Sequence, residues 1–309
     1  MYLSYSGFKL ASECLYAYWH EYVNKTPLEE PDDRLGSVYG SIVGTLFEDF
    51  YNHEWWRKDQ PQAFVMSQVE AVTDRILKQE TSPTKWGRPG GVLKWKGPKS
   101  KGGNPRAMYA DKDELMADVR DGVARGFKII RHYRLLGPYA KAEVRLDGVV
   151  DGHKLGGRAD FIIQRIRPHS DRAIYDGKGS KYRDRYVSPK QLVWYAMLYR
   201  LKYNRLPDKL AFVYWRFSPP ESIDWVDFSD ADLDALMDEV LAMIDRIETG
   251  KAELPEKGKV PDIDLMELAR KVFRPRANED NCRFCPRATA TQCSWGFAVR
   301  QEMEQRKRR

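Results

Sequence analysis

Two aspartates and a lysine are the residues in this 309-residue sequence whose types and spacing point most directly to chemistry. Asp160 follows two glycines in one expected strand, while Asp176 and Lys178 lie two residues apart in the next and so project from the same face. Carboxylate oxygens suit a hard divalent cation such as Mg²⁺, and a neighbouring ammonium group can orient or deprotonate a metal-bound water, or stabilise a pentavalent phosphate. The set therefore predicts phosphodiester hydrolysis.

A hairpin is expected to position these groups. Residues 155–166 are rich in β-branched and aromatic side chains, residues 168–171 form a polar break, and a second apolar run starts at 173–175. Alternating apolar residues over 140–150 predict a preceding strand, which carries Glu143.

Helices and further strands are expected around this hairpin. Ser188 and Pro189 open a helix, one face of which carries Gln191, Tyr195 and Tyr199 at four-residue steps. Apolar periodicity predicts the remaining elements, which are helices over 4–23, 36–58, 62–79, 111–136, 229–249 and 262–273 and strands over 209–217 and 223–228. The expected fold class is α/β, with a mixed central sheet flanked by helices.

A glutamate on an earlier helix is a further candidate ligand. Gly40 and Gly44 recur at four-residue spacing in the helix over 36–58 and allow close packing against a neighbour, and Glu48 continues this small-residue face. A glutamate beside aromatic residues is usually a solvated charge, but a face that points inward would make Glu48 a third metal ligand. His53, on the same helix, is expected to be a surface or structural residue.

Four cysteines form a second set. Cys282 and Cys285 are a C-x2-C pair, Cys293 follows after seven intervening residues, and Cys14 is the remaining cysteine. The N-terminus lacks a basic segment followed by an apolar core, and no run approaches the roughly 20 apolar residues that span a bilayer, so we expect an intracellular, cytoplasmic protein with reduced thiols.

Three interpretations of these thiols remain open: four unrelated cysteines, a zinc site, or an iron–sulfur site. Zinc ribbons usually present paired C-x2-C knuckles, whereas iron–sulfur clusters accept irregular spacing and one distant ligand. The spacing favours iron–sulfur. Such a site would join the N-terminal and C-terminal helical segments of the chain.

Basic residues exceed acidic ones and gather in two loops. The chain carries 52 Lys and Arg against 45 Asp and Glu, a formal charge of +7, which permits a nucleic-acid partner and equally fits a mildly basic surface. Residues 85–106 include seven basic residues and no acidic ones, with Trp86 and Trp95 among them. Such a loop can follow a nucleic-acid backbone while the indoles stack on bases, or be a solvated insertion. A second loop has three cations that could hold phosphates or be surface charge: Lys181, Arg183 and Arg185.

Three motifs, taken together, resemble those of the PD-(D/E)XK nuclease superfamily, and specifically of its RecB-like branch. They are Gly157-x-x-Asp160, Asp176-x-Lys178 and Gln191-x3-Tyr195, in this order on strand, strand and following helix. The cysteine arrangement is similar to that of members with a C-terminal iron–sulfur cluster, namely AddB-type helicase-nucleases and CRISPR-adaptation exonucleases. The resemblance spans nearly the whole chain, from Cys14 to Cys293.

This resemblance implies a restriction-endonuclease-like core and assigns roles by position. Asp160 and Asp176 would bind Mg²⁺ or Mn²⁺, and Lys178 would act on the attacking water. Gln191 and Tyr195 would position DNA or the active-site groups. The four cysteines would hold a 4Fe-4S cluster, with Zn²⁺ as the alternative.

The sequence departs from these relatives in three ways. Glu48 stands where the family usually has the histidine of a Gly-x3-His pattern, so this metal ligand would be a carboxylate. The seven-residue gap before Cys293 is longer than is typical of these relatives. No Walker A pattern is present, so any unwinding of DNA would come from a partner.

We therefore expect a metal-dependent DNA nuclease, with a single-strand-preferring exonuclease favoured over an endonuclease. It would act in recombination, repair, replication or adaptation, beside a helicase or recombinase. The alternative is a non-catalytic DNA-binding or scaffold protein that retains the nuclease fold. In size the chain is similar to stand-alone CRISPR-adaptation enzymes and to their viral relatives, which act in a host cytoplasm. The expected divisions are an N-terminal helical region over 1–135 with a basic loop over 84–106, a nuclease core over 136–250 and a cysteine segment over 251–309.

Overall fold

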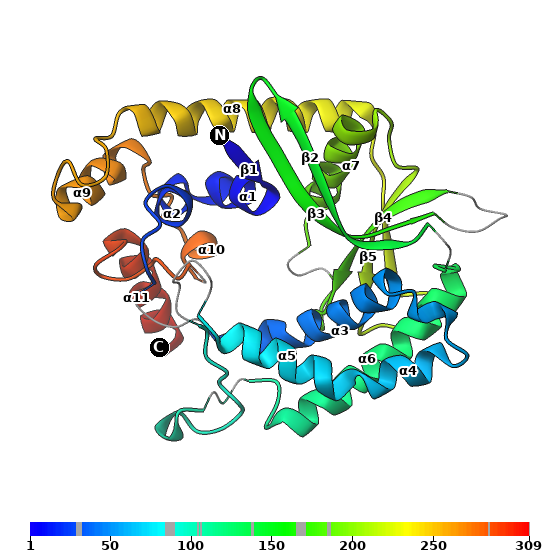
Figure 1. Cartoon of the computed structure of the whole chain (residues 1–309). Coiled ribbons are helices and arrows are strands. Elements are labelled where there is room, and N and C mark those ends of the chain that lie inside the picture. Colours follow the sequence, from blue (N-terminus) through cyan, green and yellow to red (C-terminus); the bar gives the residue numbers. More distant parts are fainter. Residues whose placement is uncertain are drawn as a thin grey trace. The chain divides into compact units, whose positions relative to one another are not determined.

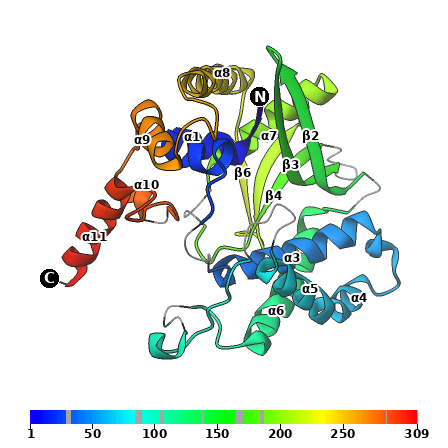
Figure 2. The same ribbon diagram turned by 60° about the vertical axis from the view of Figure 1, so that its left-hand side comes forward.

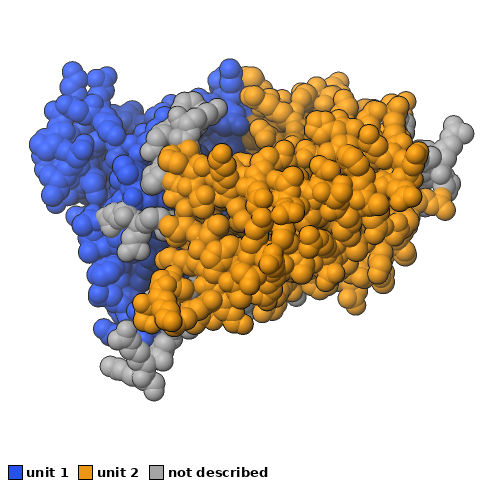
Figure 3. Space-filling model, turned by 60° about the horizontal axis from the view of Figure 1, so that its bottom comes forward, with its two compact units in different colours: residues 1–30, 150–155, 234–309 blue, residues 31–149, 156–233 orange. Residues whose placement is uncertain are grey.

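The chain forms two compact units, which Figure 3 colours separately. Unit 1 combines residues 1–30, 150–155 and 234–309, and unit 2 combines residues 31–149 and 156–233. Both ends of the chain belong to unit 1. The computed structural model describes residues 1–28, 33–83, 90–103, 105, 107–136, 139–164, 171–183, 187–283 and 285–308.

A mixed sheet is the central element of unit 2 (Figure 1). Its strands are β2 (Lys141–Val150), β3 (His153–Gln164), β4 (Arg172–Lys178), β5 (Lys209–Tyr214) and β6 (Ile223–Val226). The strand order is β3-β4-β5-β6, and β2 pairs with β3. The pairs β3–β4 and β5–β6 are antiparallel, whereas β4–β5 is parallel, which confirms the predicted hairpin and the mixed sheet. A short strand that was not predicted, β1 (Tyr2–Ser4), extends this sheet next to the start of β3, where Met1 O accepts the Lys154 N–H.

Both faces of the sheet are buried, and side chains alternate between the faces with the period of two that strands impose. Phe161 and Tyr175 belong to the main hydrophobic core on one face of the sheet. Ile174 precedes Tyr175 and therefore belongs to the opposite face, where it is also fully buried. Parallel strands require a crossover connection. The helix α7 (Pro189–Tyr203) provides it between β4 and β5.

Four helices precede the sheet in unit 2 (Figures 1 and 2). They are α3 (Leu35–Asn52), α4 (Pro61–Ser67), α5 (Val69–Thr81) and α6 (Lys112–Tyr133). Val38, Ile42 and Leu46 follow one another at four-residue steps on α3 and are completely buried, as expected for the apolar stripe of a core-facing helix. Asp111 caps α6 by accepting the Glu114 N–H at 2.9 Å.

Unit 1 is mainly helical. Its elements include α1 (Tyr5–Glu13), α2 (Leu15–Tyr18), most of α8 (Asp230–Ala252), α9 (Asp262–Val272), α10 (Glu279–Cys282) and α11 (Ser294–Arg308). A small core joins the N-terminal segment to α9, with Tyr16, Trp19 and Phe273 buried together.

Three predicted helices are wrong in their continuity. The helix expected over 36–58 ends at Asn52, and a separate 3₁₀ turn follows over Trp55–Arg57. The helix expected over 4–23 is interrupted at Cys14, whose backbone is extended (φ −160°, ψ 107°), and it ends in a π-helical turn over Trp19–Val23. The helix expected over 62–79 divides into α4 and α5 at Gln68. Apolar periodicity continues across the breaks at Cys14 and Gln68, and therefore gave no sign of them. Among the described residues, no helix is both long and apolar enough to cross a membrane.

Candidate active site

The register of the hairpin brings the two predicted aspartates together. Phe161 lies opposite Tyr175 at the last pair of the antiparallel ladder, so Asp160 and Asp176 are each the next residue beyond this pair. Asp160 Oδ2 also accepts the Gly177 N–H at 2.8 Å, which ties this carboxylate to the end of β4.

A lysine and two residues of α7 form a hydrogen-bonded set with Asp176, next to Asp160. Lys178 forms an ion pair with Asp176, and its Nζ donates to Gln191 Oε1 at 3.2 Å. Gln191 Nε2 donates to Asp176 Oδ1 at 2.9 Å and to the Tyr195 hydroxyl at 3.3 Å. The structure thus places five predicted residues together: Asp160, Asp176, Lys178, Gln191 and Tyr195.

The carboxylate pair carries more negative charge than its surroundings neutralise. Burial raises the pKa of Asp160 well above its usual range and the charge of Asp176 raises it further, against the Gly177 N–H and the Lys178 ammonium. Burial also raises the pKa of Asp176, which is 2% exposed, although Lys178 opposes the rise. Two carboxyl groups that share one ammonium group resist ionisation until another cation approaches.

A cavity of about 540 Å³ lies beside Asp160, with walls from α3 and the sheet. Glu48 lines it, together with the small residues Gly40 and Gly44 of the same helix. Burial raises the pKa of Glu48, and the charge of Glu143 raises it further. The predicted third carboxylate therefore shares a cavity with Asp160.

Two other residues of this cavity were not predicted to be functional. Arg158 and Glu143 form an ion pair at 2.9 Å on the cavity wall. Arg158 stands two residues before Asp160, so the period of two could have identified it. Glu143 has a φ of 53° within β2, a left-handed conformation that costs a non-glycine residue about 1–3 kcal/mol. No feature of the sequence indicates this backbone conformation.

The carboxylates of the site match part of what a divalent cation requires. Mg²⁺ is usually held by one or two carboxylates, with waters and substrate phosphate oxygens completing its octahedron. Asp160 and Asp176 supply such a pair. Within the described ranges, however, no three His, Cys, Asp or Glu side chains are gathered closely enough to hold a metal ion. The carboxylate pair therefore fits Mg²⁺ or Mn²⁺, while Glu48 does not complete a three-ligand group.

The four cysteines line one cavity within unit 1. Burial raises the pKa of Cys285 and Cys293, and the charges of neighbouring cysteines raise it further. The extended backbone at Cys14 places its thiol beside those of the C-terminal segment. The cavity measures about 20 Å³, and among the described residues no three of these thiols are gathered closely enough to hold a metal ion, so the cysteines share a cavity without forming a complete metal site.

Three residues proposed to contact DNA can be placed. Lys181 is exposed and lines a second cavity, which has a volume of about 510 Å³. Arg183 forms an ion pair with Asp224, and Trp95 is partly buried against the main core. Two further candidates, Trp86 and Arg185, lie outside the described residues.

A mixed sheet that presents neighbouring carboxylates and a lysine at the end of its central hairpin defines a nuclease-type α/β fold. The family model described as "PD-(D/E)XK nuclease superfamily" matches residues 2–290. The chain belongs to this superfamily.

Individual relatives are remote. A crystal structure from Eubacterium rectale, whose protein carries a provisional name as an exonuclease, is 15% identical and has a TM-score of 0.43, with 85% of this chain and 92% of that chain covered. A structure of a protein named SSO0001 is 17% identical and has a TM-score of 0.24, with 41% of this chain and 63% of that chain covered. No curated protein matches the chain significantly.

Proposed function

We propose that the protein is a Mg²⁺- or Mn²⁺-dependent DNA nuclease of the RecB-like branch. The observation that carries this proposal is the hydrogen-bonded set of Asp176, Lys178, Gln191 and Tyr195, beside Asp160, which accepts from the Gly177 N–H between Asp176 and Lys178. The two carboxyl groups have raised pKa values and share one ammonium group. A buried pair of this kind is stabilised by an added cation.

Each residue of the set has a distinct task in this proposal. Asp160 and Asp176 would hold the cation, which when bound lowers the pKa of a water and polarises the scissile phosphate. Lys178 lies against Asp176 and would stabilise the charge that develops on the phosphate. Gln191 contacts both Lys178 and Asp176, so it would hold the ammonium and the carboxylate in a fixed relation.

We further propose that the substrate is a single DNA strand attacked from an end, in concert with a helicase or recombinase. The small residues Gly40 and Gly44 support a strand-sized channel, because they leave the α3 wall of the cavity free of bulky side chains. A Cβ on Gly44 would meet nothing within 4 Å, so the wall is open at this point.

The test is degradation of end-labelled DNA by the wild type, Asp176→Ala and Lys178→Ala in Mg²⁺ and in Mn²⁺. Both variants should lose about 10³-fold or more in rate while remaining folded. The matched controls are Asp147→Ala, at an exposed site on β2, and Lys209→Ala, on β5, neither of which touches the set. Full cleavage by either active-site variant would refute the mechanism. Substrates blocked at the 5′ or the 3′ end distinguish an exonuclease from an endonuclease and give its polarity.

A non-catalytic DNA-binding protein is the second candidate. One observation favours it: among the described residues, no three His, Cys, Asp or Glu side chains lie close enough together to hold a metal ion. This function predicts DNA binding without degradation in either metal, for the wild type as for the variants.

We also propose that Cys14, Cys282, Cys285 and Cys293 hold a 4Fe-4S cluster. The support is that the four thiols share one cavity although 267 residues separate Cys14 from Cys282. Anaerobically purified protein should be brown and contain iron and acid-labile sulfide, and Cys14→Ser should lose both. A colourless protein with equimolar zinc would identify a zinc site instead, and a metal-free protein would refute both assignments.

A further inference from the structure

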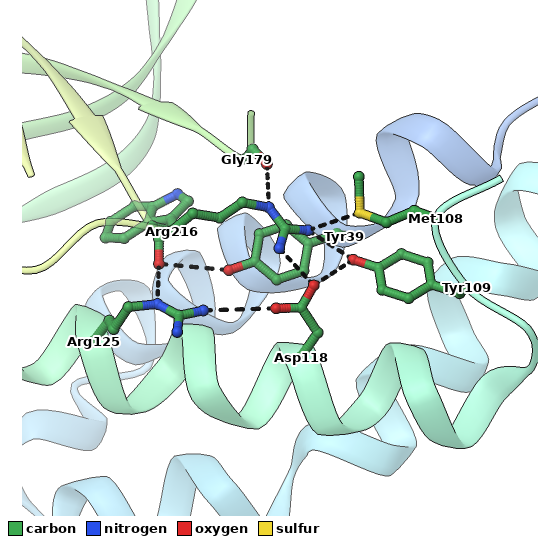
Figure 4. Close-up of polar contacts among 8 residues, drawn as sticks. Tyr39, Met108, Tyr109, Asp118, Arg125, Gly179 and Arg216 are labelled. Atoms are coloured by element: carbon green, nitrogen blue, oxygen red, sulfur yellow. Dashed lines mark hydrogen bonds and ion pairs between the residues drawn. The ribbon is translucent and has the colours of Figure 1, made fainter. Parts of the chain in front are cut away.

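A buried arginine lies just beyond the proposed active site, at the end of β5 (Figure 4). The Arg216 side chain is only 8% exposed. It donates from Nη1 to Asp118 at 2.5 Å, from Nη2 to the Tyr109 hydroxyl at 2.7 Å and from Nε to the Gly179 carbonyl at 2.8 Å. Its guanidinium carbon also lies 3.5 Å from the centroid of the Tyr39 ring. One side chain therefore connects α3, α6 and the segment that follows β4.

The charge of this arginine is fully compensated. Asp118 accepts from Arg216 and from the Tyr109 hydroxyl, the latter at 2.6 Å, and lies 3.6 Å from Arg125. Burial alone would raise the pKa of Asp118, but the hydrogen bonds from Tyr109 and Arg216 and the nearby positive charges lower it below its usual value. The cluster is thus a stable ionic unit, with no group left to act as an acid or base.

Arg216 and its neighbour Trp215 contact the backbone around Lys178, whose side chain carries the proposed catalytic ammonium. Gly179, which accepts from Arg216, directly follows Lys178 in the chain. The Trp215 N–H donates to the Lys178 carbonyl at 3.1 Å, and the Trp215 carbonyl accepts from Arg125 at 3.1 Å. The backbone on both sides of the Lys178 peptide is therefore tied to β5, α6 and Arg216.

Glycines bring α3 against the same segment. A Cβ on Gly179 would lie 2.6 Å from the Gly40 Cα, and a Cβ on Gly177 would lie 2.8 Å from the Trp215 indole nitrogen. Real Cβ atoms do not approach other atoms this closely, so α3 and the end of β4 meet backbone to backbone. Glu48 lies two turns beyond Gly40 on the same helix.

We propose that Arg216 is a positioning residue for the active site. Arg216 fixes the Gly177–Gly179 segment against α3 and thereby holds Lys178 at the correct position relative to the two carboxylates. This inference rests on the proposed nuclease function. The planar guanidinium is required because its fork reaches three acceptors in fixed directions, which a lysine ammonium cannot match. Arg216 itself does not touch the reacting groups.

The experiment compares Arg216→Lys with a matched control at the opposite end of β4. Arg172 donates to the Tyr199 hydroxyl at 2.9 Å and to Gln164 at 2.8 Å, so Arg172→Lys also removes arginine hydrogen bonds from this strand. Each variant is assayed for kcat and KM on end-labelled DNA at a temperature at which it is fully folded. Arg216→Lys should lower kcat about 100-fold with little change in KM, because a displacement of about 1 Å suffices for such a loss. Arg172→Lys should keep kcat within about twofold of the wild type.

Amide hydrogen exchange supplies a readout that does not depend on catalysis. The Gly177 N–H donates to Asp160, and the Trp215 N–H donates to Lys178. Both amides should exchange at least tenfold faster in Arg216→Lys than in the wild type, and at the wild-type rate in Arg172→Lys. Unchanged exchange in Arg216→Lys, or equal losses of kcat in both variants, would overturn the positioning role. If the wild type proves inactive, the nuclease proposal fails while the exchange rates still decide whether Arg216 holds this segment.

Discussion

Unit 2 contains two groups of buried or half-buried carboxylates that differ in how their charge is compensated. Asp118 accepts hydrogen bonds from Tyr109 and Arg216, which lower its pKa even though burial alone would raise it. Asp160 and Asp176 share a single ammonium group, and burial raises the pKa of both. The two clusters lie within one unit and are joined through the end of β4, so the same fold supports both arrangements.

The difference shows that burial by itself does not mark a functional site. Asp118 accepts hydrogen bonds from Tyr109 and Arg216 and lies near Arg125, so its cluster contributes to stability without a bound ligand. The Asp160–Asp176 pair accepts from the Gly177 N–H, the Gln191 amide and one ammonium group, but a single positive charge faces two carboxyl groups, so the pair destabilises the fold until a cation binds. Perturbed carboxyl groups of this kind gather at functional sites. Four variants test whether the two groups of carboxylates differ in this way.

The largest effect is expected for Asp160→Asn. This change removes one of the two like charges and one proposed metal ligand, so cleavage should fall about 10³-fold. In metal-free buffer the same variant should be more stable than the wild type, with a melting temperature about 2–4 °C higher, the shift expected for 1 kcal/mol in a domain of this size. Thermal unfolding followed by circular dichroism measures it. A lower melting temperature would show that the carboxylate pair is not strained.

Asp118→Ala should have the opposite effect on stability. It leaves Arg216 buried without its counter-ion, and removal of one partner of a buried ion pair costs about 3–5 kcal/mol. Urea unfolding measures the loss. Asp147→Ala is the control, because this exposed aspartate of β2 should change the free energy of unfolding by less than about 0.5 kcal/mol. A similar small change in Asp118→Ala would mean that the cluster is not a stabilising unit.

The stabilities of the two clusters should also depend on pH in opposite directions. The folded pKa of Asp160 is raised, so the metal-free protein loses stability as pH rises from the unfolded value near 3.9 towards the folded value, and the advantage of Asp160→Asn grows over that range. The folded pKa of Asp118 is lowered, so its contribution is present above the unfolded value and disappears as pH falls through the folded value. Melting temperatures of Asp160→Asn, Asp118→Asn and the wild type, measured between about pH 3 and 7, test both slopes. Slopes of the same sign would contradict the comparison.

The smallest effect is expected for His53→Ala. This histidine follows α3, its side chain is 64% exposed, and its Nε2 lies 3.6 Å from Asp49, outside both clusters. The variant should unfold within about 0.5 kcal/mol of the wild type and cleave DNA at the same rate. A loss of cleavage would add His53 to the site.

The hairpin and the carboxylate pair could be predicted from sequence because their information is local. The alternation of apolar residues shows which side chains of β3 and β4 share a face, and a polar break marks the turn between the two strands. Only this short hairpin separates Asp160 from Asp176, so their proximity could be predicted. The helix that carries Gln191 and Tyr195 could also be predicted, since Ser188 and Pro189 open it, but their proposed site role came from the family resemblance.

The Arg216 cluster could not be predicted, because no pattern links its members. Asp118 and Arg216 are 98 residues apart, and each would pass as a surface charge in its own segment. The break at Cys14 escaped detection because the apolar periodicity of Leu10, Ala17 and Tyr18 continues across it. Both features arise when segments that are distant in the sequence pack together.

The wide separation between Asp118 and Arg216 has a consequence for folding. The Asp160–Asp176 hairpin closes a short loop, and Gln191 follows within 15 residues of Asp176, so these groups can assemble early. The ion pair of Arg216 with Asp118 can form only after α7 and β5 have added to the sheet, because β5 pairs in parallel with β4 across the whole crossover. The groups of the proposed active site would therefore come together before the contacts of Arg216 form, and the proposed nuclease would reach its active geometry only when folding is complete.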